Sequence, residues 1–489
     1  MPPTNPASVC DWRMSAGSRD AMPTPRETYI VSPMGFGWMR PKIIAKPPGP
    51  KARAIIKSDE KLLMQSNWRY LPFVPKTGAG CYVEDVDGNV FLDLVSGAAV
   101  MNVGIGNKEV LEAIFKQSNE LVYSAIPGYY YHELVNELAE KLIRLTPGSF
   151  AKRCSLGLSG ADATDVAMKV ARFATGRHRF ISFIGSNHGL GTYGSTSLQG
   201  LSTLMLSGFG PMVPGITHVP YPYPYRCAFG PECKDCENRS LDYLEDYIFK
   251  TIVPPEDTAA IFVEPIQGDG GVLSPSTGFF KRLREICDKF SILLVADEVQ
   301  TGFGRTGRMF AFEHHPKVTA DIVLLGKPLG NGLPVSACVG REEFMKLPRG
   351  SIAITGAGHL LGCASALAAI EVIEKRHLCS NADAVGRSFA RGIKNLMDRF
   401  EIIGDVRGKG LLIGIELVNS RSSREPATQE IKELNKLLYE RGILTAYDGL
   451  YGNVFRIMPP LTLSQDDAKI AVGIFEESFR EFSRRTARQ

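Results

Sequence analysis

The chain has 489 residues, of which 44% are hydrophobic and 22% charged, enough to bury a large core divided into two or three domains. Its formal charge of +4 comes from 56 basic and 52 acidic residues spread along the chain, without the basic stripes that nucleic acid or anionic lipid requires. No apolar run approaches the length of about 18 residues that a membrane span needs. Ten cysteines are too few for a disulfide scaffold, which predicts reduced thiols and a cytoplasmic location.

The N-terminal sequence indicates a flexible extension that is followed by a β-hairpin. Residues 1–40 carry scattered prolines and charges and lack the apolar core of a secretion peptide, so we expect a flexible extension. The stretch CYVEDVDGNVFLDL, residues 81–94, has two alternating segments around Asp87-Gly88, a pair typical of a tight hairpin turn. Helical spacing of apolar residues follows at 111–117 and at 134–145.

A well-capped helix is predicted from Ser159 to Gly176. Ser159 can cap its first turn, Asp162 completes a capping box, and Gly176 provides the stop. Taken alone this is a core helix. However, the small residues Gly160 and Ala161 leave backbone N–H groups at the helix start open to an anion such as phosphate.

Short apolar strands then alternate with helices. We expect strands at 179–184, 259–263, 292–296 and 321–325, and helices at 241–249 and 279–289. This alternation predicts an α/β fold with a mainly parallel sheet. After about residue 365 the order changes to a helix, the strands of GDVRGKGLLIGIEL, a helix and a final strand in NVFRIMPPL. We therefore expect a large domain at 101–364 and a smaller α+β domain built from both chain ends, 41–100 and 365–489.

One cysteine cluster lies in a loop. Cys227, Cys233 and Cys236 stand in RCAFGPECKDCENRS, where three thiols suggest a metal site. No fourth cysteine or histidine lies nearby, so free thiols are favoured and no metal is expected.

Three polar residues follow apolar strands. Glu264 ends AAIFV, Asp297 ends ILLVA and Lys327 follows DIVLLG. Ligands of an open parallel sheet bind beyond the carboxyl ends of its strands, so these side chains are candidates for a site. An ammonium group is costly to bury without a partner or a covalent purpose. The alternative for Lys327 is a side chain that extends from the sheet edge into solvent.

The run Gly302-x-Gly304-x-x-Gly307 satisfies the dinucleotide-binding pattern. That pattern requires a strand that turns directly into a helix, so that the pyrophosphate meets backbone N–H groups. Here Asp297 to Thr301 separate the strand from the first glycine, and no apolar helical face follows. A nicotinamide cofactor is therefore disfavoured.

A phosphate cradle, a carboxylate and a strand-end lysine together suit pyridoxal 5′-phosphate, because the lysine can form an imine with the aldehyde while the carboxylate keeps the pyridine nitrogen protonated. From about residue 41 to 480 the chain resembles the class III aminotransferases of fold type I. The resemblance is carried by FVEPIQGDGG, LLVADEVQTGFGRTGRMFAFEH, DIVLLGKPLGNGLPVSACVG and GDVRGKGLLIGIEL.

The resemblance implies roles for residues around the cofactor. Lys327 would be the Schiff-base lysine, Asp297 would pair with the pyridine nitrogen, and Val299 would pack on the ring. Gln300 would reach the phenolic oxygen, while Gly160 and Ala161 would hold the phosphate.

It also implies substrate and subunit contacts. Thr355 matches a threonine that binds the phosphate of the neighbouring subunit, which implies a homodimer. Arg456 matches the arginine for the substrate α-carboxylate, a fork suited to that anion. Asp269 stands where some members have a glutamate that neutralises this arginine.

Two departures from the family concern the ring and the substrate. Asn187 replaces the aromatic residue that usually stacks on the ring, so either His188 takes that place or stacking is weaker. Leu190 replaces the arginine that many 4-aminobutyrate enzymes use for a distal carboxylate, which disfavours that substrate.

The resemblance predicts an aminotransferase that moves an amino group from an amino acid or ω-amino compound to a 2-oxo acid in a ping-pong reaction. The alternative within the fold is an amino-acid racemase or epimerase, because MNVG and HVPYPYPYR are similar to archaeal members with that activity. A third hypothesis is a cofactor-free scaffold protein that has lost the chemistry. The retention of Lys327 and Asp297 argues against it.

Overall fold

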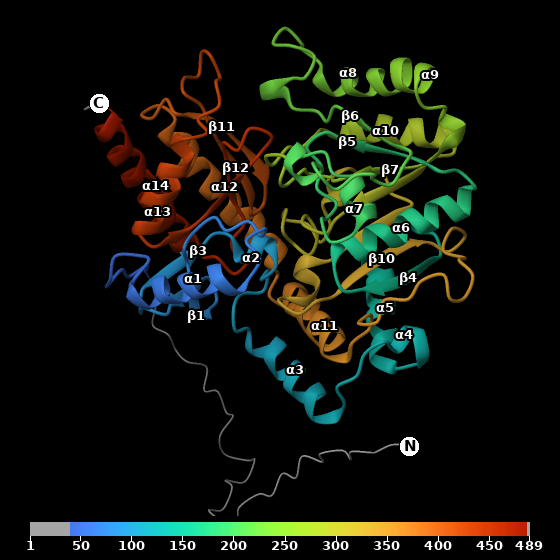
Figure 1. Cartoon of the computed structure of the whole chain (residues 1–489), viewed down its shortest axis with the longest axis horizontal. Helices are drawn as coiled ribbons and strands as arrows, with labels where there is room; N and C mark the ends of the chain where they lie inside the picture. The colour runs from blue at the N-terminus through green and yellow to red at the C-terminus, as the bar shows by residue number, and fades with distance from the viewer. Residues whose placement is uncertain (1–39, 487–489) are drawn as a thin grey trace, which may run out of the picture. The chain divides into compact units, whose positions relative to one another are not determined.

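The computed structural model describes residues 40–486 (Figure 1). The predicted extension, 1–40, lies almost wholly outside this range, and the predicted domain boundaries stay predictions. No helix within 40–486 combines the length and the apolar character that a membrane crossing requires.

A seven-stranded sheet forms the centre of the α/β part. Its strands, in spatial order, are β4 (Lys152–Gly157), β10 (Ser336–Arg341), β9 (Ile322–Leu325), β8 (Leu293–Asp297), β7 (Thr258–Val263), β5 (Arg179–Phe183) and β6 (Ile216–Val219). Strand β10 runs antiparallel to both neighbours, and the other strands share one direction. The predicted mainly parallel sheet is confirmed, and the carboxyl ends of its parallel strands meet at one edge.

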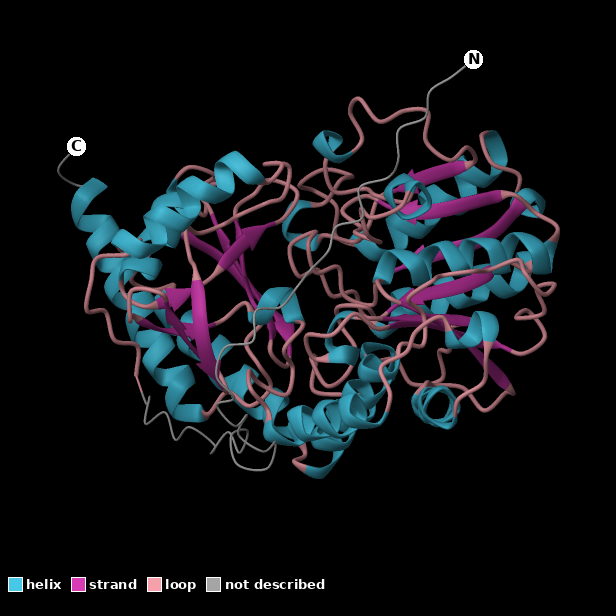
Figure 2. Cartoon of the chain, turned by 60° about the horizontal axis from the view of Figure 1, so that its bottom comes forward, coloured by secondary structure: helices cyan, strands magenta, loops and turns pink. Residues whose placement is uncertain are grey.

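Helices cover both faces of this sheet, as Figure 2 shows. Phe180 and Phe262 pack in one buried cluster with residues of α6 (Gly160–Thr175). Phe183 and Val263 pack in another cluster with residues of α10 (Thr277–Phe290). Burial on both faces explains why these strands are continuous apolar runs in the sequence.

Two four-stranded sheets lie outside the large sheet, and one of them joins both ends of the chain. One contains the predicted hairpin and a late strand, in the order β1 (Pro75–Ala79), β2 (Tyr82–Asp85), β3 (Val90–Asp93) and β13 (Ile443–Leu444). The other has the order β11 (Ile403–Lys409), β12 (Leu412–Leu417), β15 (Val454–Ile457) and β14 (Ala446–Asp448). Because β13 pairs with β3, the expected small α+β part built from both ends is confirmed.

The remaining helices flank these sheets. They are α1 (Pro50–Leu62), α2 (Ser96–Ala99), α3 (Lys108–Glu120), α4 (Ile126–Tyr129), α5 (Glu133–Leu145), α7 (Tyr193–Ser197), α8 (Cys236–Asp242), α9 (Phe249–Thr251), α11 (Leu360–Lys375), α12 (Leu378–Leu396), α13 (Glu430–Glu440) and α14 (Gln465–Thr486). The helix expected at 241–249 starts earlier and contains a π-helical turn, Tyr243–Ile248, between α8 and α9.

The glycine-rich run after β8 forms turns, as the sequence indicates, and opens no helix. Its Arg305 is fully buried. The guanidinium donates to the carbonyls of Leu411, at 2.9 Å, and Pro459, at 2.5 Å, and to Oδ1 of Asn102, at 2.5 Å. The glycine-rich run therefore contacts three segments that are distant in sequence, around Asn102, Leu411 and Pro459. These contacts account for its conformation, and no bound nucleotide is needed to explain it.

Candidate active site

A cavity of 320 Å³ opens at the carboxyl edge of the large sheet. The structure brings eight of the predicted site residues to it: Gly160, Ala161, His188, Asp269, Asp297, Val299, Gln300 and Lys327. Arg456 contacts the cavity through Asp269. Thr355 does not line it and lies exposed in a turn. The gathering follows from topology, since strands that end in polar residues end together.

The start of α6 forms one end of the cavity. Ser159 Oγ accepts the N–H of Asp162 at 3.3 Å, so the predicted capping box is confirmed. The N–H groups of Gly160 and Ala161 have no acceptor among the described residues. A Cβ on Gly160 would lie 2.8 Å from Cγ1 of Val299, so only glycine fits there without displacing the valine. Two free N–H groups at a helix start make an anion site.

Asp297 and His188 form a buried pair below this end. Asp297 is 4% exposed, and its Oδ1 accepts the N–H of Val299 at 3.0 Å. Its Oδ2 lies 2.7 Å from Nδ1 of His188, whose side chain is fully buried. With Nδ1 as the donor, the imidazole fixes the orientation of the carboxylate. Of the two possibilities left open by the sequence, this burial favours weaker stacking rather than an imidazole over the ring.

Lys327 enters the cavity from the end of β9. The strand stops at Leu325, and Lys327 begins a 3₁₀ turn with φ of +40°. A non-glycine residue with positive φ is strained by roughly 1–3 kcal/mol, and such strain concentrates at functional sites. Burial lowers the pKa of the Lys327 ammonium, although Asp269 partly opposes this effect. Burial therefore shifts Lys327 towards the neutral amine, the form that can act as nucleophile and base.

Arg456 is held between two carboxylates. It is 4% exposed on β15, with Nη1 paired to Asp269 and Nη2 to Asp448. The Tyr70 hydroxyl donates to Oδ1 of Asp448 at 2.8 Å. Burial alone would raise the pKa of Asp269, but Arg456 and then Lys327 hold it at about 2. No local sequence pattern indicates Asp448 and Tyr70 as partners of Arg456, because only the pairing of β14 with β15 brings Asp448 to the arginine.

Asn187 contacts the acidic residues of the cavity. Its backbone N–H donates to Oε1 of Glu264 at 2.9 Å, and its amide donates to Asp269. Burial, together with the charge of Asp297, raises the pKa of Glu264 well above its usual value. Asn187 therefore acts on the carboxylates rather than as a substitute for an aromatic ring.

A larger outer pocket of 1050 Å³ continues from the cavity. The two share Asn187, Leu190, Gly191 and Asp269. Large apolar side chains line the outer part: Trp68, Tyr193, Leu201, Leu204, Met205 and Phe209. A substrate side chain that leaves the cavity past Leu190 thus meets these apolar groups together with polar residues that include Arg69 and Asp448.

The cysteine loop holds free thiols at Cys227, Cys233 and Cys236. Sγ of Cys236 accepts the N–H of Tyr223 at 3.3 Å. Within residues 40–486 no group of three or more His, Cys, Asp or Glu side chains is arranged to hold a metal ion.

Residues 64–479 match the sequence pattern of the family described as Aminotransferase class-III. The chain belongs to the class III aminotransferase family. An alanine/serine racemase of Pyrococcus horikoshii is 40% identical over 90% of this chain and 93% of its own. A leucine/methionine racemase of Thermococcus litoralis is 41% identical over 81% of this chain and 88% of its own. The amine transaminase of an uncultivated Pseudomonas species, solved in its PLP-bound form, is 31% identical with a TM-score of 0.78, covering 86% of this chain and 98% of its own.

Class III aminotransferases use pyridoxal 5′-phosphate, and the residues present fit that cofactor. The free N–H groups of Gly160 and Ala161 offer an anion site, and the missing Cβ of Gly160 keeps space beside Val299. A buried carboxylate and a half-buried amine line the same cavity. The expected cofactor is thus confirmed by the family and compatible with the geometry.

Proposed function

We propose that this class III aminotransferase homologue is an amino-acid racemase or epimerase that acts on neutral amino acids. The observation that carries the proposal is that two relatives, 40% and 41% identical over most of the chain, are named racemases of alanine and serine and of leucine and methionine. This replaces transamination as the first hypothesis. The large apolar side chains in the outer pocket past Leu190 support a neutral substrate side chain, and Arg69 lines the same pocket.

The cofactor would lie with its phosphate at the N–H groups of Gly160 and Ala161 and its pyridine nitrogen at Asp297. Val299 would contact the ring, and Gln300 would reach the phenolic oxygen. His188 would act through Asp297, because its Nδ1 lies 2.7 Å from that carboxylate. When bound, the cofactor withdraws electrons from the Cα of an attached amino acid and acidifies its proton.

Lys327 would both remove and return that proton. Its Nζ makes no hydrogen bond or ion pair with the described residues, so it is free to move. The other titratable groups in the cavity have partners: His188 pairs with Asp297 and Asp269 with Arg456. Glu264 accepts the backbone N–H groups of Asn187 and Gly268. A single base that serves both faces of the substrate follows from this arrangement.

Arg456 would receive the α-carboxylate after Asp269 moves away. Asp269 has other donors available, since the Gln300 amide lies 3.2 Å from its Oδ1 and the Asn187 amide contacts Oδ2. The carboxylate can thus leave the arginine without becoming unpaired in the protein interior.

The test uses one pure enantiomer of alanine, leucine or isoleucine with the cofactor-loaded protein and no 2-oxo acid. Chiral chromatography is expected to show the opposite enantiomer, or the epimer for isoleucine, without accumulation of oxo acid. The Lys327→Ala variant serves as the control and should form neither. If oxo acid appears in proportion to substrate loss and no enantiomer forms, the racemase proposal is wrong.

Transamination is the second candidate, because the amine transaminase above is 31% identical and shares the fold. An amino donor would then be exchanged with a 2-oxo acid acceptor in a ping-pong reaction. Turnover that requires added pyruvate or 2-oxoglutarate supports this candidate.

A homodimer would complete the site. Exposed aromatic residues gather in one segment, with Tyr129 81% and Tyr131 95% exposed. The N–H of Leu360 donates to the carbonyl of Tyr123 at 3.0 Å, which places this segment beside the turn that carries Thr355. We expect light scattering to give twice the chain mass, and Thr355→Ala to weaken cofactor binding without separating the subunits.

A further inference from the structure

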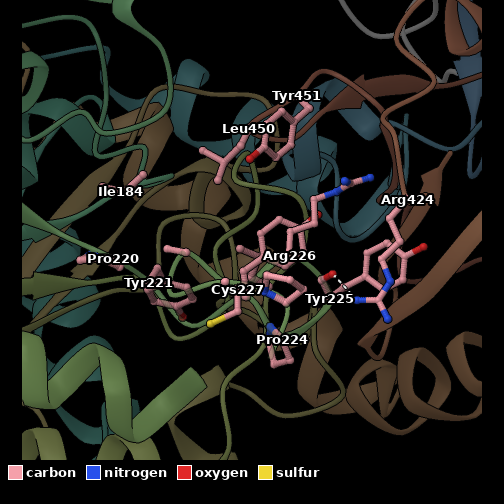
Figure 3. A pocket seen from close by; sticks show the side chains of 15 residues that line it. Ile184, Pro220, Tyr221, Pro224, Tyr225, Arg226, Cys227, Arg424, Leu450 and Tyr451 are labelled. Carbon is pink, nitrogen blue, oxygen red and sulfur yellow. Dashed lines mark hydrogen bonds between the residues drawn. The ribbon is translucent and has the colours of Figure 1, made fainter. Parts of the chain in front are cut away.

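A second pocket, of 490 Å³, lies apart from the cavity and the outer pocket. It shares no lining residue with either of them. Its wall comes mainly from residues 220–231, the stretch that contains YPYPYRC, with Arg424, Leu450 and Tyr451 from the C-terminal part of the chain (Figure 3). Figure 3 shows Tyr225 and Arg424 on the side of the pocket opposite Pro220 and Tyr221.

Among the described residues, the charged side chains that line this pocket are those of two arginines, and no carboxylate lines it. Arg226 is 12% exposed, and its Nε pairs with the buried Glu416 at 2.5 Å. Its Nη2 has no partner among the described residues. Arg424 donates from Nη1 to the carbonyl of Tyr225 at 3.0 Å and forms no ion pair with the described residues. The lining is therefore positively charged: Arg424 has unused hydrogen-bond donors, whereas the unpartnered Nη2 of Arg226 is buried.

Both guanidinium groups lie near the same aromatic ring. The Cζ of Arg226 is 5.5 Å and that of Arg424 is 4.9 Å from the ring centroid of Tyr225. Arg226 also lies 5.3 Å from the ring of Tyr451. Because Glu416 already balances the charge of Arg226, Arg424 is the guanidinium that lacks a carboxylate among the described residues, and an anion in the pocket would supply one.

The backbone of Arg424 adopts a strained conformation at the edge of the pocket. Its φ is +55°, a conformation that a long side chain rarely adopts, and its N–H donates to the carbonyl of Ser420 at 2.9 Å. A strained backbone conformation persists only where surrounding contacts hold it in place, and such residues are concentrated at ligand and active sites. The turn therefore holds Arg424 beside Tyr225 at the edge of the pocket.

We propose that this pocket binds a small organic carboxylate, with the carboxylate at Arg226 and Arg424 and the apolar body against the rings of Tyr221 and Tyr451. Arginine forks match a planar carboxylate, and the other lining residues include Ile184, Pro220, Leu273 and Leu450. The site is independent of the proposed racemase activity.

The walls of the pocket are joined to the catalytic cavity. The Tyr221 hydroxyl donates to the carbonyl of Glu264 at 2.8 Å. The N–H of Gly449, next to Leu450, donates to the carbonyl of Asp269 at 2.9 Å. A ligand in the second pocket would therefore contact Tyr221, which is hydrogen-bonded to the backbone of Glu264, and Leu450, which adjoins the residue hydrogen-bonded to the backbone of Asp269.

The test is calorimetric titration of the cofactor-loaded protein with benzoate. Arg424→Gln removes one guanidinium from an exposed loop and should weaken the benzoate binding at this pocket at least tenfold. The matched control is Arg421→Gln, which changes an arginine of the same loop that does not line the pocket and should bind as the wild type does. Benzamide, the neutral isostere, should not bind there.

Three results would overturn the proposal: no benzoate binding to the wild type, equal binding by Arg424→Gln, or equal binding of inorganic phosphate, which lacks an apolar body. Benzoate that binds at Arg456 instead would be lost in Arg456→Lys and kept in Arg424→Gln. Tyr451→Ala gives a second variant, since this exposed ring should contribute to benzoate and not to phosphate binding.

Discussion

The double pairing of Arg456 leads to a prediction for Asp448→Asn. A substrate α-carboxylate can take Nη1 when Asp269 moves, whereas Asp448 stays on Nη2 because the Tyr70 hydroxyl holds it. The substrate carboxylate then lies beside a fixed carboxylate of the same charge. Removing that charge should therefore strengthen substrate binding.

The size of the effect follows from the geometry of a guanidinium. Carboxylates on its two Nη atoms lie about 5 Å apart, and their repulsion at an effective dielectric constant of about 20 is about 3 kcal/mol. In the resting protein Asp448 repels Asp269 in the same way, and Asp269 stays in the cavity after it moves, so removing the charge yields only about half of this repulsion as a gain in substrate binding. The net gain of about 1.4 kcal/mol corresponds to a KM about tenfold lower.

The assay compares KM and kcat of wild type, Asp448→Asn and Tyr70→Phe with the amino acid that the wild type converts. Tyr70→Phe keeps the charge of Asp448 and loses only its hydrogen bond, so its KM should change less than threefold. A tenfold higher KM for Asp448→Asn, with an unchanged melting temperature, would refute the reasoning and show that Asp448 positions the arginine more than it competes for it.

Three further predictions concern the cofactor site and acid stability. Gly160→Ala places a Cβ 2.8 Å from Cγ1 of Val299 and should weaken cofactor retention at least tenfold, as followed by the cofactor absorbance during dialysis. His188→Leu removes the group 2.7 Å from Asp297 and should lower kcat roughly 10- to 100-fold with a smaller change in KM; an unchanged kcat would exclude the positioning role. Despite its burial, Asp269 has a pKa of about 2 because of the neighbouring guanidinium, so its contribution to the free energy of unfolding is fully present above pH ~4 and is lost as the pH falls towards 2. Denaturant titrations at pH 5 and pH 3 should show a smaller difference for Asp269→Asn than for wild type.

The sequence predicts most of the large sheet because its strands are buried on both faces. The short, continuous apolar runs at 259–263 and 292–296 are typical of strands buried on both faces. The polar residues after such runs identify the edge of the sheet at which Asp297 and Lys327 lie. The capping residues of α6 are equally local. In each case a short segment carries the whole physical reason for its structure.

Other features depend on distant pairings that no local pattern contains. Asp448 reaches Arg456 because β14 pairs with β15, and Tyr70 reaches Asp448 across 378 positions of sequence. The burial of His188 behind Asp297 likewise depends on the loop after β5 reaching the end of β8, although β7 lies between the two strands in the sheet. Sequence periodicity therefore predicts the strands that carry Asp297 and Lys327, but it does not predict the residues that pair with Arg456 and Asp297.

The central claim is that the Lys327 amine carries the cofactor and moves the substrate proton. Borohydride treatment of the cofactor-loaded protein, followed by proteolysis and mass spectrometry, tests it directly. We predict that the peptide containing Lys327 gains the mass of the reduced cofactor at that residue. An unlabelled Lys327 in fully loaded protein, or a label on another lysine, would contradict the account.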